Sequence, residues 1–148
     1  MRALLQRTTG ASVVVAGATV GSIDQGLVVF LGVAPSDDEA TATSLAQRIT
    51  ELRIFRDAEG RTNESLIDVG GAVLLVSQFT LFADTRRGRR PGFTGAAPPE
   101  QAKRLYERMA AALRAHSVTV ETGRFGEEMA VQLTNDGPFT IWLDTDDR

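Results

Sequence analysis

Hydrophobic residues in most of this chain either alternate with polar ones or form short unbroken runs, and both patterns are typical of β-strands. Residues 26–33 are apolar at consecutive positions, as expected of a strand that is covered on both faces. The segments that predict strands are residues 2–6, a hairpin over 12–23 turning near Ala16 and Gly17, residues 26–33, two short pieces flanking a turn at 57–60, a central strand from Ala72 after a turn at 70–71, and two or three strands after residue 117.

Two segments have helical periodicity instead. Residues 36–52 open with Ser36 and Glu39 in capping-box spacing, and apolar residues then recur at helical intervals. The second segment runs from Pro98 to about His116, has prolines in its first turn, and carries an apolar stripe typical of a helix packed on a core. Two helices among roughly eight extended segments predict an α/β domain whose helices cover one face of a mixed or antiparallel sheet. The N-terminal hairpin and a second copy of the chain would cover the other face, so we expect a homodimer.

The composition excludes several kinds of site and of binding surface. A chain of 148 residues, 43% of them hydrophobic, fits a single domain over residues 1–148. It has no cysteine and one histidine, which excludes a disulfide framework, a thiolate zinc site and a cysteine nucleophile. A net charge of −3 argues against an extended nucleic-acid surface, although a local basic patch could still contact RNA. No apolar run approaches the ~18 residues of a membrane span, so we expect a cytoplasmic protein without membrane contact.

Polar residues gather at the end of the predicted central strand. Ser77 follows the apolar run of residues 72–76, and alternation places it on one face while Gln78 and Thr80 lie on the other. One such residue is as typical of a turn or of solvent as of a site. Three within four positions favour a ligand site, because ligands in α/β sheets collect at the carboxyl ends of strands.

A second stretch, NDGPFT at residues 135–140, lies between two predicted strands. Gly137 permits unusual backbone angles, and Pro138 has no N–H, so this corner offers carbonyl acceptors and a stiff shape. The Gly–Pro bond could be cis or trans. Taken alone, the stretch predicts only a turn.

At these two stretches the chain resembles the D-aminoacyl-tRNA deacylases. SQFTLFA at residues 77–83 and NDGPFT at 135–140 resemble the two signature motifs of that family. The likeness extends over nearly the whole chain and includes LLQRTTGASV, RIFRDAEGR, RRGRRPGF and TGRFGEEM. Phe139 stands where the family usually has valine.

The resemblance implies a homodimeric three-layer fold of helices, sheet and second sheet, and an esterase that removes D-amino acids, and glycine, from the 3′ end of tRNA. It implies that the Gly137–Pro138 bond is cis and enters the partner subunit's pocket, where backbone carbonyls hold the amino group and an L side chain does not fit. Residues 77–80 would line that pocket, with Phe125 and Met129 against the terminal adenine. Arg7 would brace the Gly–Pro corner.

This chemistry is compatible with a site that lacks cysteine and histidine. An aminoacyl ester is already activated, so positioning and a hydrogen-bond donor at the developing oxyanion supply much of the acceleration. The backbone N–H of Phe79 or Thr80 is our candidate donor, and Ser77 and Gln78 would position the terminal ribose. The adjacent ribose hydroxyl of the tRNA would help to activate water. We expect no cofactor and no metal.

Other functions fit less well. A serine hydrolase would need Ser77 or Thr80 paired with a base, but His116 lies at a helix end with no G-x-S-x-G context. One histidine and scattered carboxylates supply no metal-ligand cluster. A non-catalytic RNA-binding dimer is the main alternative, with phosphate bound by Arg86, Arg87, Arg89 and Arg90. We expect contact with the tRNA acceptor end and none with DNA.

Overall fold

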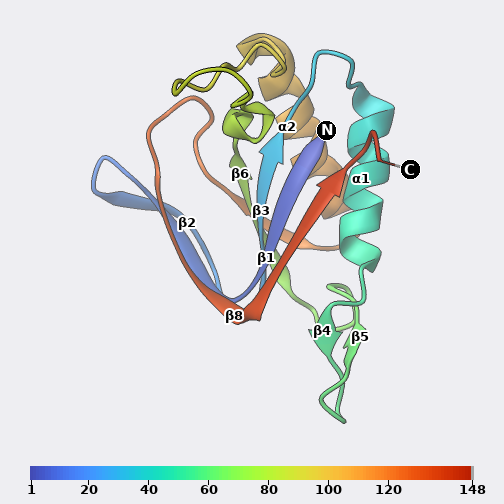
Figure 1. Cartoon of the computed structure of the whole chain (residues 1–148). Coiled ribbons are helices and arrows are strands. Elements are labelled where there is room, and N and C mark those ends of the chain that lie inside the picture. The colour runs from blue at the N-terminus through green and yellow to red at the C-terminus, as the bar shows by residue number, and fades with distance from the viewer. Residues whose placement is uncertain (148) are drawn as a thin grey trace.

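The structure, a computed structural model, describes residues 1–147. Its main feature is one mixed sheet with two helices beside it (Figure 1). In chain order the elements are β1 (Arg2–Val15), β2 (Ala18–Ile23), β3 (Gly26–Gly32), α1 (Glu39–Glu51), β4 (Phe55–Arg56), β5 (Thr62–Glu64), β6 (Ala72–Ser77), the short 3₁₀ helix η1 (Phe79–Phe82), α2 (Pro99–Ala115), β7 (Thr119–Thr122) and β8 (Ala130–Asp144).

The main sheet has the strand order β2-β1-β3-β6-β7, and β8 pairs with β1. Strands β3, β6 and β7 are parallel, whereas β1 is antiparallel to each of its partners. The first half of β1 pairs with β3 and its second half with β2. The predicted mixed sheet is therefore confirmed.

Both faces of the central strands are covered. On β6, Val73 and Leu75 pack into the core beneath the helices, while Leu74 and Val76 pack into a second core with residues of β1 and β2. The helices, the central strands, and the curled β1, β2 and β8 segment thus form successive layers (Figure 1). Full burial of a leucine such as Leu75 contributes roughly 1.5–3 kcal/mol, so these two cores fix the position of β6.

Helix boundaries follow local hydrogen bonding. The carboxylate of Asp38 accepts the backbone N–H of Thr41 at 2.8 Å and caps α1. The predicted capping box at Ser36 is wrong, because Glu39 is the first residue of the helix instead of its third. Helix α2 runs from Pro99 to Ala115, and His116 is its C-terminal cap, so the prediction that His116 lies at a helix C-terminus is confirmed.

The strand β6 is shorter than its apolar pattern predicts. Alternation holds as far as Ser77, and the N–H of Gln78 makes a last ladder bond of 2.8 Å to the carbonyl of Leu31. The chain then turns into η1, which packs over the end of β3. Gly32 permits this approach, since a Cβ there would lie 3.0 Å from the Phe82 ring and 3.1 Å from the Gln78 carbonyl oxygen. The prediction that strand alternation extends to Thr80 is therefore wrong.

Two breaks between predicted strands, one between residues 6 and 12 and one at residues 135–140, lie inside long strands instead. Residues 2–15 form the single strand β1, and the 135–140 corner belongs to β8. The pairing of β8 with β1 resumes after the corner, with Asn135 opposite Thr8 and Thr140 opposite Gln6. Residues 136–139 therefore bulge opposite the single residue Arg7. No helix within residues 1–147 has the length and apolar character needed to cross a membrane.

Candidate active site

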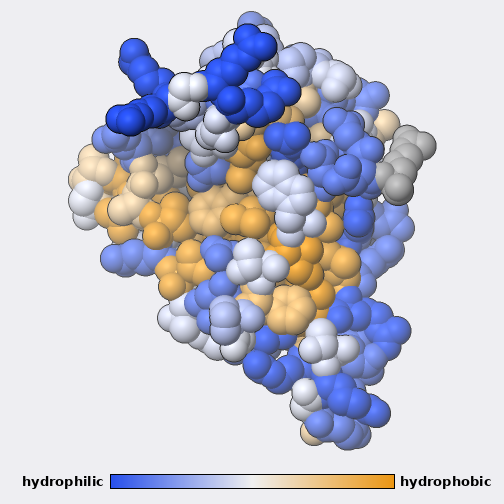
Figure 2. Space-filling view, viewed as in Figure 1, coloured by the Kyte–Doolittle hydropathy of each residue, from blue (hydrophilic) through white to orange (hydrophobic). Residues whose placement is uncertain are grey.

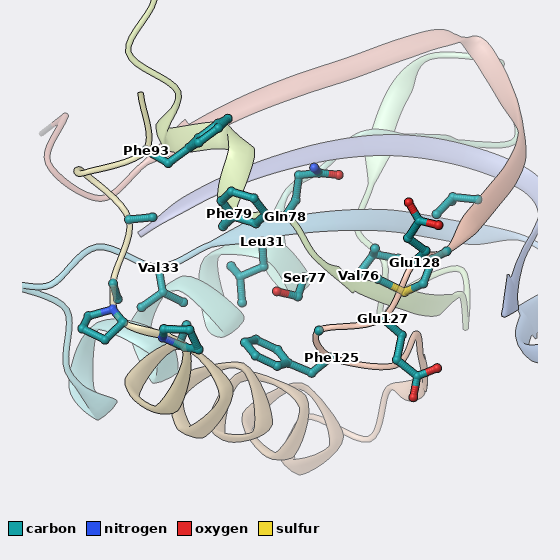
Figure 3. Close-up of a pocket in the computed structure, with 18 residues that line it drawn as sticks. Leu31, Val33, Val76, Ser77, Gln78, Phe79, Phe93, Phe125, Glu127 and Glu128 are labelled. Carbon is teal, nitrogen blue, oxygen red and sulfur yellow. The ribbon is translucent and has the colours of Figure 1, made fainter. Parts of the chain in front are cut away.

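A cavity of about 780 Å³ opens at the carboxyl ends of β3 and β6. Its walls come from these strand ends, from the start of α2, and from the loop between β7 and β8 (Figure 3). The side chain of Ser77 points into the cavity above Phe125, and Phe79 lies beside Phe93 on another wall (Figure 3). Most of the lining is apolar, so the cavity suits a ligand with flat or apolar groups and a few polar anchoring points.

A buried tyrosine contacts Phe125 of the cavity wall. The hydroxyl of Tyr106, on α2, donates to the carbonyl of Leu75 at 2.8 Å, and the same carbonyl accepts the N–H of Gly123 at 3.1 Å. The Tyr106 ring contacts the Phe125 ring with centroids 5.9 Å apart. Burial raises the pKa of Tyr106 to about 12, which keeps its hydroxyl a donor at neutral pH. This contact ties the loop that carries Phe125 to the end of β6.

The turn after β6 leaves backbone donors free. Within residues 1–147, the hydrogen bonds found include none donated by the N–H of Phe79 or Thr80. Such orphan donors are usual at the start of a helical turn and are available to a ligand. The Gln78 side-chain amide donates to the Thr80 hydroxyl, while the Phe79 ring packs edge-on against Phe93 at 5.0 Å. Phe79 lines the cavity, whereas Thr80 is exposed outside it.

The Gly–Pro corner is held by Arg7. This side chain is only 3% exposed, and its Nη1–H and Nε–H donate to the carbonyls of Ile54 at 2.6 Å and Asp136 at 3.1 Å. Its guanidinium also lies 3.3 Å from the Asp136 carboxylate and 4.6 Å above the Phe139 ring centroid. The Gly137–Pro138 bond is cis, and Gly137 has φ +138°. Both corner residues are exposed, so Arg7 holds the corner from behind and leaves it open to solvent.

The cavity and the corner lie at opposite ends of the sheet. Arg7, opposite the corner, pairs with Leu27 at the start of β3, whereas Ser77 pairs with Leu31 near the end of β3. Four residues of strand span roughly 13 Å. The two motifs that the sequence singles out therefore do not meet within one chain.

Of the predicted site residues, the structure brings five together in the cavity and leaves four outside it. The five are Ser77, Gln78, Phe79, Phe125 and Met129, and the four are Thr80, Arg7, Gly137 and Pro138. Phe93, Glu127 and Glu128 also line the cavity, although they were not among the predicted site residues. Phe93 is the last residue of the RRGRRPGF stretch, but no periodicity marks it as a residue of the cavity wall.

Known proteins share this sequence and fold. The model of the D-Tyr-tRNA(Tyr) deacylase family matches residues 4–144. The chain belongs to this family. A D-aminoacyl-tRNA deacylase of Dinoroseobacter shibae is 60% identical over 97% of this chain and 99% of its own. A protein of the same name from Lacticaseibacillus casei is 56% identical over 99% of both chains.

Solved structures of related proteins have the same fold. One described as "c-Myc DNA Unwinding Element Binding Protein" superimposes with a TM-score of 0.91 at 36% identity, covering 98% of this chain and 99% of that one. A probable eukaryotic D-amino acid tRNA deacylase superimposes with a TM-score of 0.85 over 96% of this chain and 97% of its own, and at 18% identity that likeness concerns the fold alone.

Proposed function

We propose that this chain hydrolyses the ester bond of D-aminoacyl-tRNA and releases the free D-amino acid and the tRNA. The observation that carries the proposal is family membership over residues 4–144, together with full-length relatives named D-aminoacyl-tRNA deacylase. The cavity agrees with it, because an apolar chamber at the strand ends suits an aminoacyl-adenosine group.

In the reaction, a water oxygen bonds to the ester carbonyl carbon, and the bond from that carbon to the ribose oxygen breaks. The N–H of Phe79 or Thr80 donates to the developing oxyanion, and removal of one such donor typically costs about 10²–10³ in kcat. Phe79 is the better placed of the two, since it lines the cavity. The adjacent ribose hydroxyl of the substrate assists the attacking water, and the departing ribose oxygen takes up a proton.

The remaining cavity residues position the substrate. Phe125 and Met129, from the loop before β8, contact the terminal adenine, and Ser77 and Gln78 bind the ribose hydroxyls. Positioning of this kind supplies several kcal/mol of the barrier reduction when the reacting atoms are aligned. An ester activated in this way needs no side-chain nucleophile, so the serine-hydrolase alternative with His116 is unnecessary.

Chirality is set by the Gly137–Pro138 corner of the partner subunit in a homodimer. The corner is exposed, is braced from behind by Arg7, and lies too far along the sheet to enter the cavity of its own chain. Its carbonyls accept from the substrate amino group, and its rigid wall excludes a side chain of L configuration. Glycine has no side chain to exclude, so glycyl-tRNA formed by mischarging of tRNA-Ala is a substrate as well.

An uncovered apolar row offers the surface for a second copy. Phe30, Leu4 and Trp142 lie side by side on neighbouring strands, on the sheet face away from the helices, and Trp142 is 45% exposed. Apolar residues gather across the face over which β8 runs (Figure 2). Such exposed apolar surface favours association, and a two-fold dimer places each corner against the other subunit.

Release of tyrosine from D-tyrosyl-tRNA by the purified protein tests the activity. Binding of the tRNA without release would instead favour the non-catalytic RNA-binding dimer.

Mixing two inactive variants tests whether the site is shared between subunits. Phe79→Pro, which removes a backbone donor in the cavity, is combined with Gly137→Ala, which alters the corner. In a mixed dimer one of the two sites contains neither substitution, so equal random mixing should restore about a quarter of wild-type activity. Absence of any recovery, when mixed dimers are shown to form, would place cavity and corner of a working site in one chain.

A further inference from the structure

The loop after η1 is a closed structure that carries four arginines in residues 86–90. Asp84 and Gly92 exchange two backbone hydrogen bonds, of 2.7 and 2.9 Å, which close the base of the loop. Gly88, at its middle, has φ +70°, a left-handed turn that glycine adopts without strain. The loop therefore holds its arginines on a defined turn.

Most of the positive charge on this loop is uncompensated. Arg86 is held by Asp84, with Nε and Nη2 at 2.9 and 2.8 Å from the two carboxylate oxygens. These contacts hold the pKa of Asp84 well below its usual range. The ion pairs found among residues 1–147 include none with Arg87, Arg89 or Arg90, which are all exposed. Strongly hydrophilic side chains project at the place where Figure 1 shows this loop (Figure 2).

The same loop is joined to the cavity wall. Phe93 directly follows the closing residue Gly92, lines the cavity, and packs against Phe79 at 5.0 Å. The apex at Gly88 lies four residues from the base, which spans at most roughly 14 Å of extended chain. The exposed arginines are therefore carried by a short loop whose base adjoins the cavity wall at Phe93.

We propose that Arg87, Arg89 and Arg90 bind the backbone phosphates of the tRNA acceptor end, next to the nucleotide held in the cavity. This inference rests on the proposed function and adds a second contact surface to it. An arginine run is usually a solvated surface, but here the chain as a whole has a net charge of −3, and these arginines lie on a closed loop whose base adjoins the cavity wall. Phosphate contacts of this kind position the nucleic acid and carry no sequence information.

The test compares the wild type with a triple variant, Arg87→Ala, Arg89→Ala and Arg90→Ala, on two substrates. One is D-tyrosyl-tRNA, and the other is the small ester D-tyrosyl-adenosine, which has no phosphate backbone. A control variant, Arg48→Ala, Arg61→Ala and Arg108→Ala, removes the same charge from exposed positions outside the cavity lining. Binding of uncharged tRNA is measured at several salt concentrations.

Each phosphate contact contributes about 0.7 to the slope of log affinity against log salt for a single strand, so three contacts contribute roughly 2. When the salt concentration rises fourfold, the affinity of the wild type for tRNA should therefore fall roughly 16 times more than the affinity of the loop variant. The ratio of kcat/KM on tRNA to kcat/KM on the small ester should fall in the loop variant, through KM, and stay at the wild-type value in the control.

Equal salt slopes and equal substrate ratios in the wild type and the loop variant would overturn the proposal while leaving the deacylase function intact. Failure of the wild type to cleave either substrate would instead remove the proposed function. An equal loss in the control variant would show that overall charge, and not this loop, governs tRNA binding, and would also overturn the proposal.

Discussion

Replacement of Arg7 by methionine tests the role of the buried guanidinium behind the Gly–Pro corner. Methionine fills a similar volume and leaves no buried charge, but it removes the donors to Ile54 and Asp136. It also removes the cation above Phe139. The change therefore loosens the corner without introducing a group that the core cannot hold.

The two hydrogen bonds from a charged donor contribute about 1.5–3 kcal/mol each, and loss of both leaves two carbonyls without these partners. Methionine does not require desolvation of a charge, which offsets part of this loss. The net decrease in the free energy of unfolding should be about 2–4 kcal/mol, which lowers Tm by roughly 5–15 °C for a domain of this size. A corner displaced by about 1 Å should lower kcat/KM on D-tyrosyl-tRNA roughly 100-fold.

Thermal unfolding and deacylation are measured on the same preparations, beside Arg56→Met as the matched control. Arg56 lies 3.2 Å from the same Asp136 carboxylate, but its side chain is 52% exposed. Loss of such an exposed pair should cost no more than about 1 kcal/mol and leave activity near the wild type. If Arg7→Met has the same Tm and the same kcat/KM as Arg56→Met, the bracing role of Arg7 is refuted.

Three further substitutions test the site. Gly137→Ala places a Cβ 3.0 Å from the backbone nitrogen of Phe139 at φ +138°. It should lower the free energy of unfolding by roughly 1–3 kcal/mol and remove most activity on D-tyrosyl-tRNA. The control Gly60→Ala, with φ +78° and open space around the new Cβ, should retain activity. Thr80→Val should lower kcat only modestly, because the proposed donor is backbone N–H, and complete loss in a folded protein would favour a nucleophilic threonine. Tyr106→Phe should lower the free energy of unfolding in urea by about 0.5–1.5 kcal/mol through loss of its bond to Leu75, and an unchanged value would contradict that contact.

Burial explains which parts of the fold could be predicted. On β6, strand alternation correctly predicts the face of each residue from Val73 to Val76. Both faces of the strand are buried, so each side chain packs into one of the two cores. Beyond Ser77 the pattern stays apolar, but the chain turns, because η1 packs on β3 at Gly32. That contact joins residues far apart in sequence, and no local pattern encodes it.

The sequence predicted individual site residues but not their arrangement in space. The polar cluster at the strand end singled out Ser77, and the family resemblance singled out the Gly137–Pro138 corner. The structure places the two at opposite ends of the sheet. This separation follows from the register of the strands, which cannot be predicted from either motif alone. Phe93 was missed for a similar reason, since its role comes from a contact with Phe79 across the turn.

Hydrolysis of matched D- and L-tyrosyl-tRNA by the purified protein tests the central claim most directly. Release of free tyrosine is measured for both substrates at equal enzyme and tRNA concentrations. The proposed site predicts rapid release from the D substrate and release from the L substrate no faster than without enzyme. Equal rates on the two substrates, or no release from either, would contradict it.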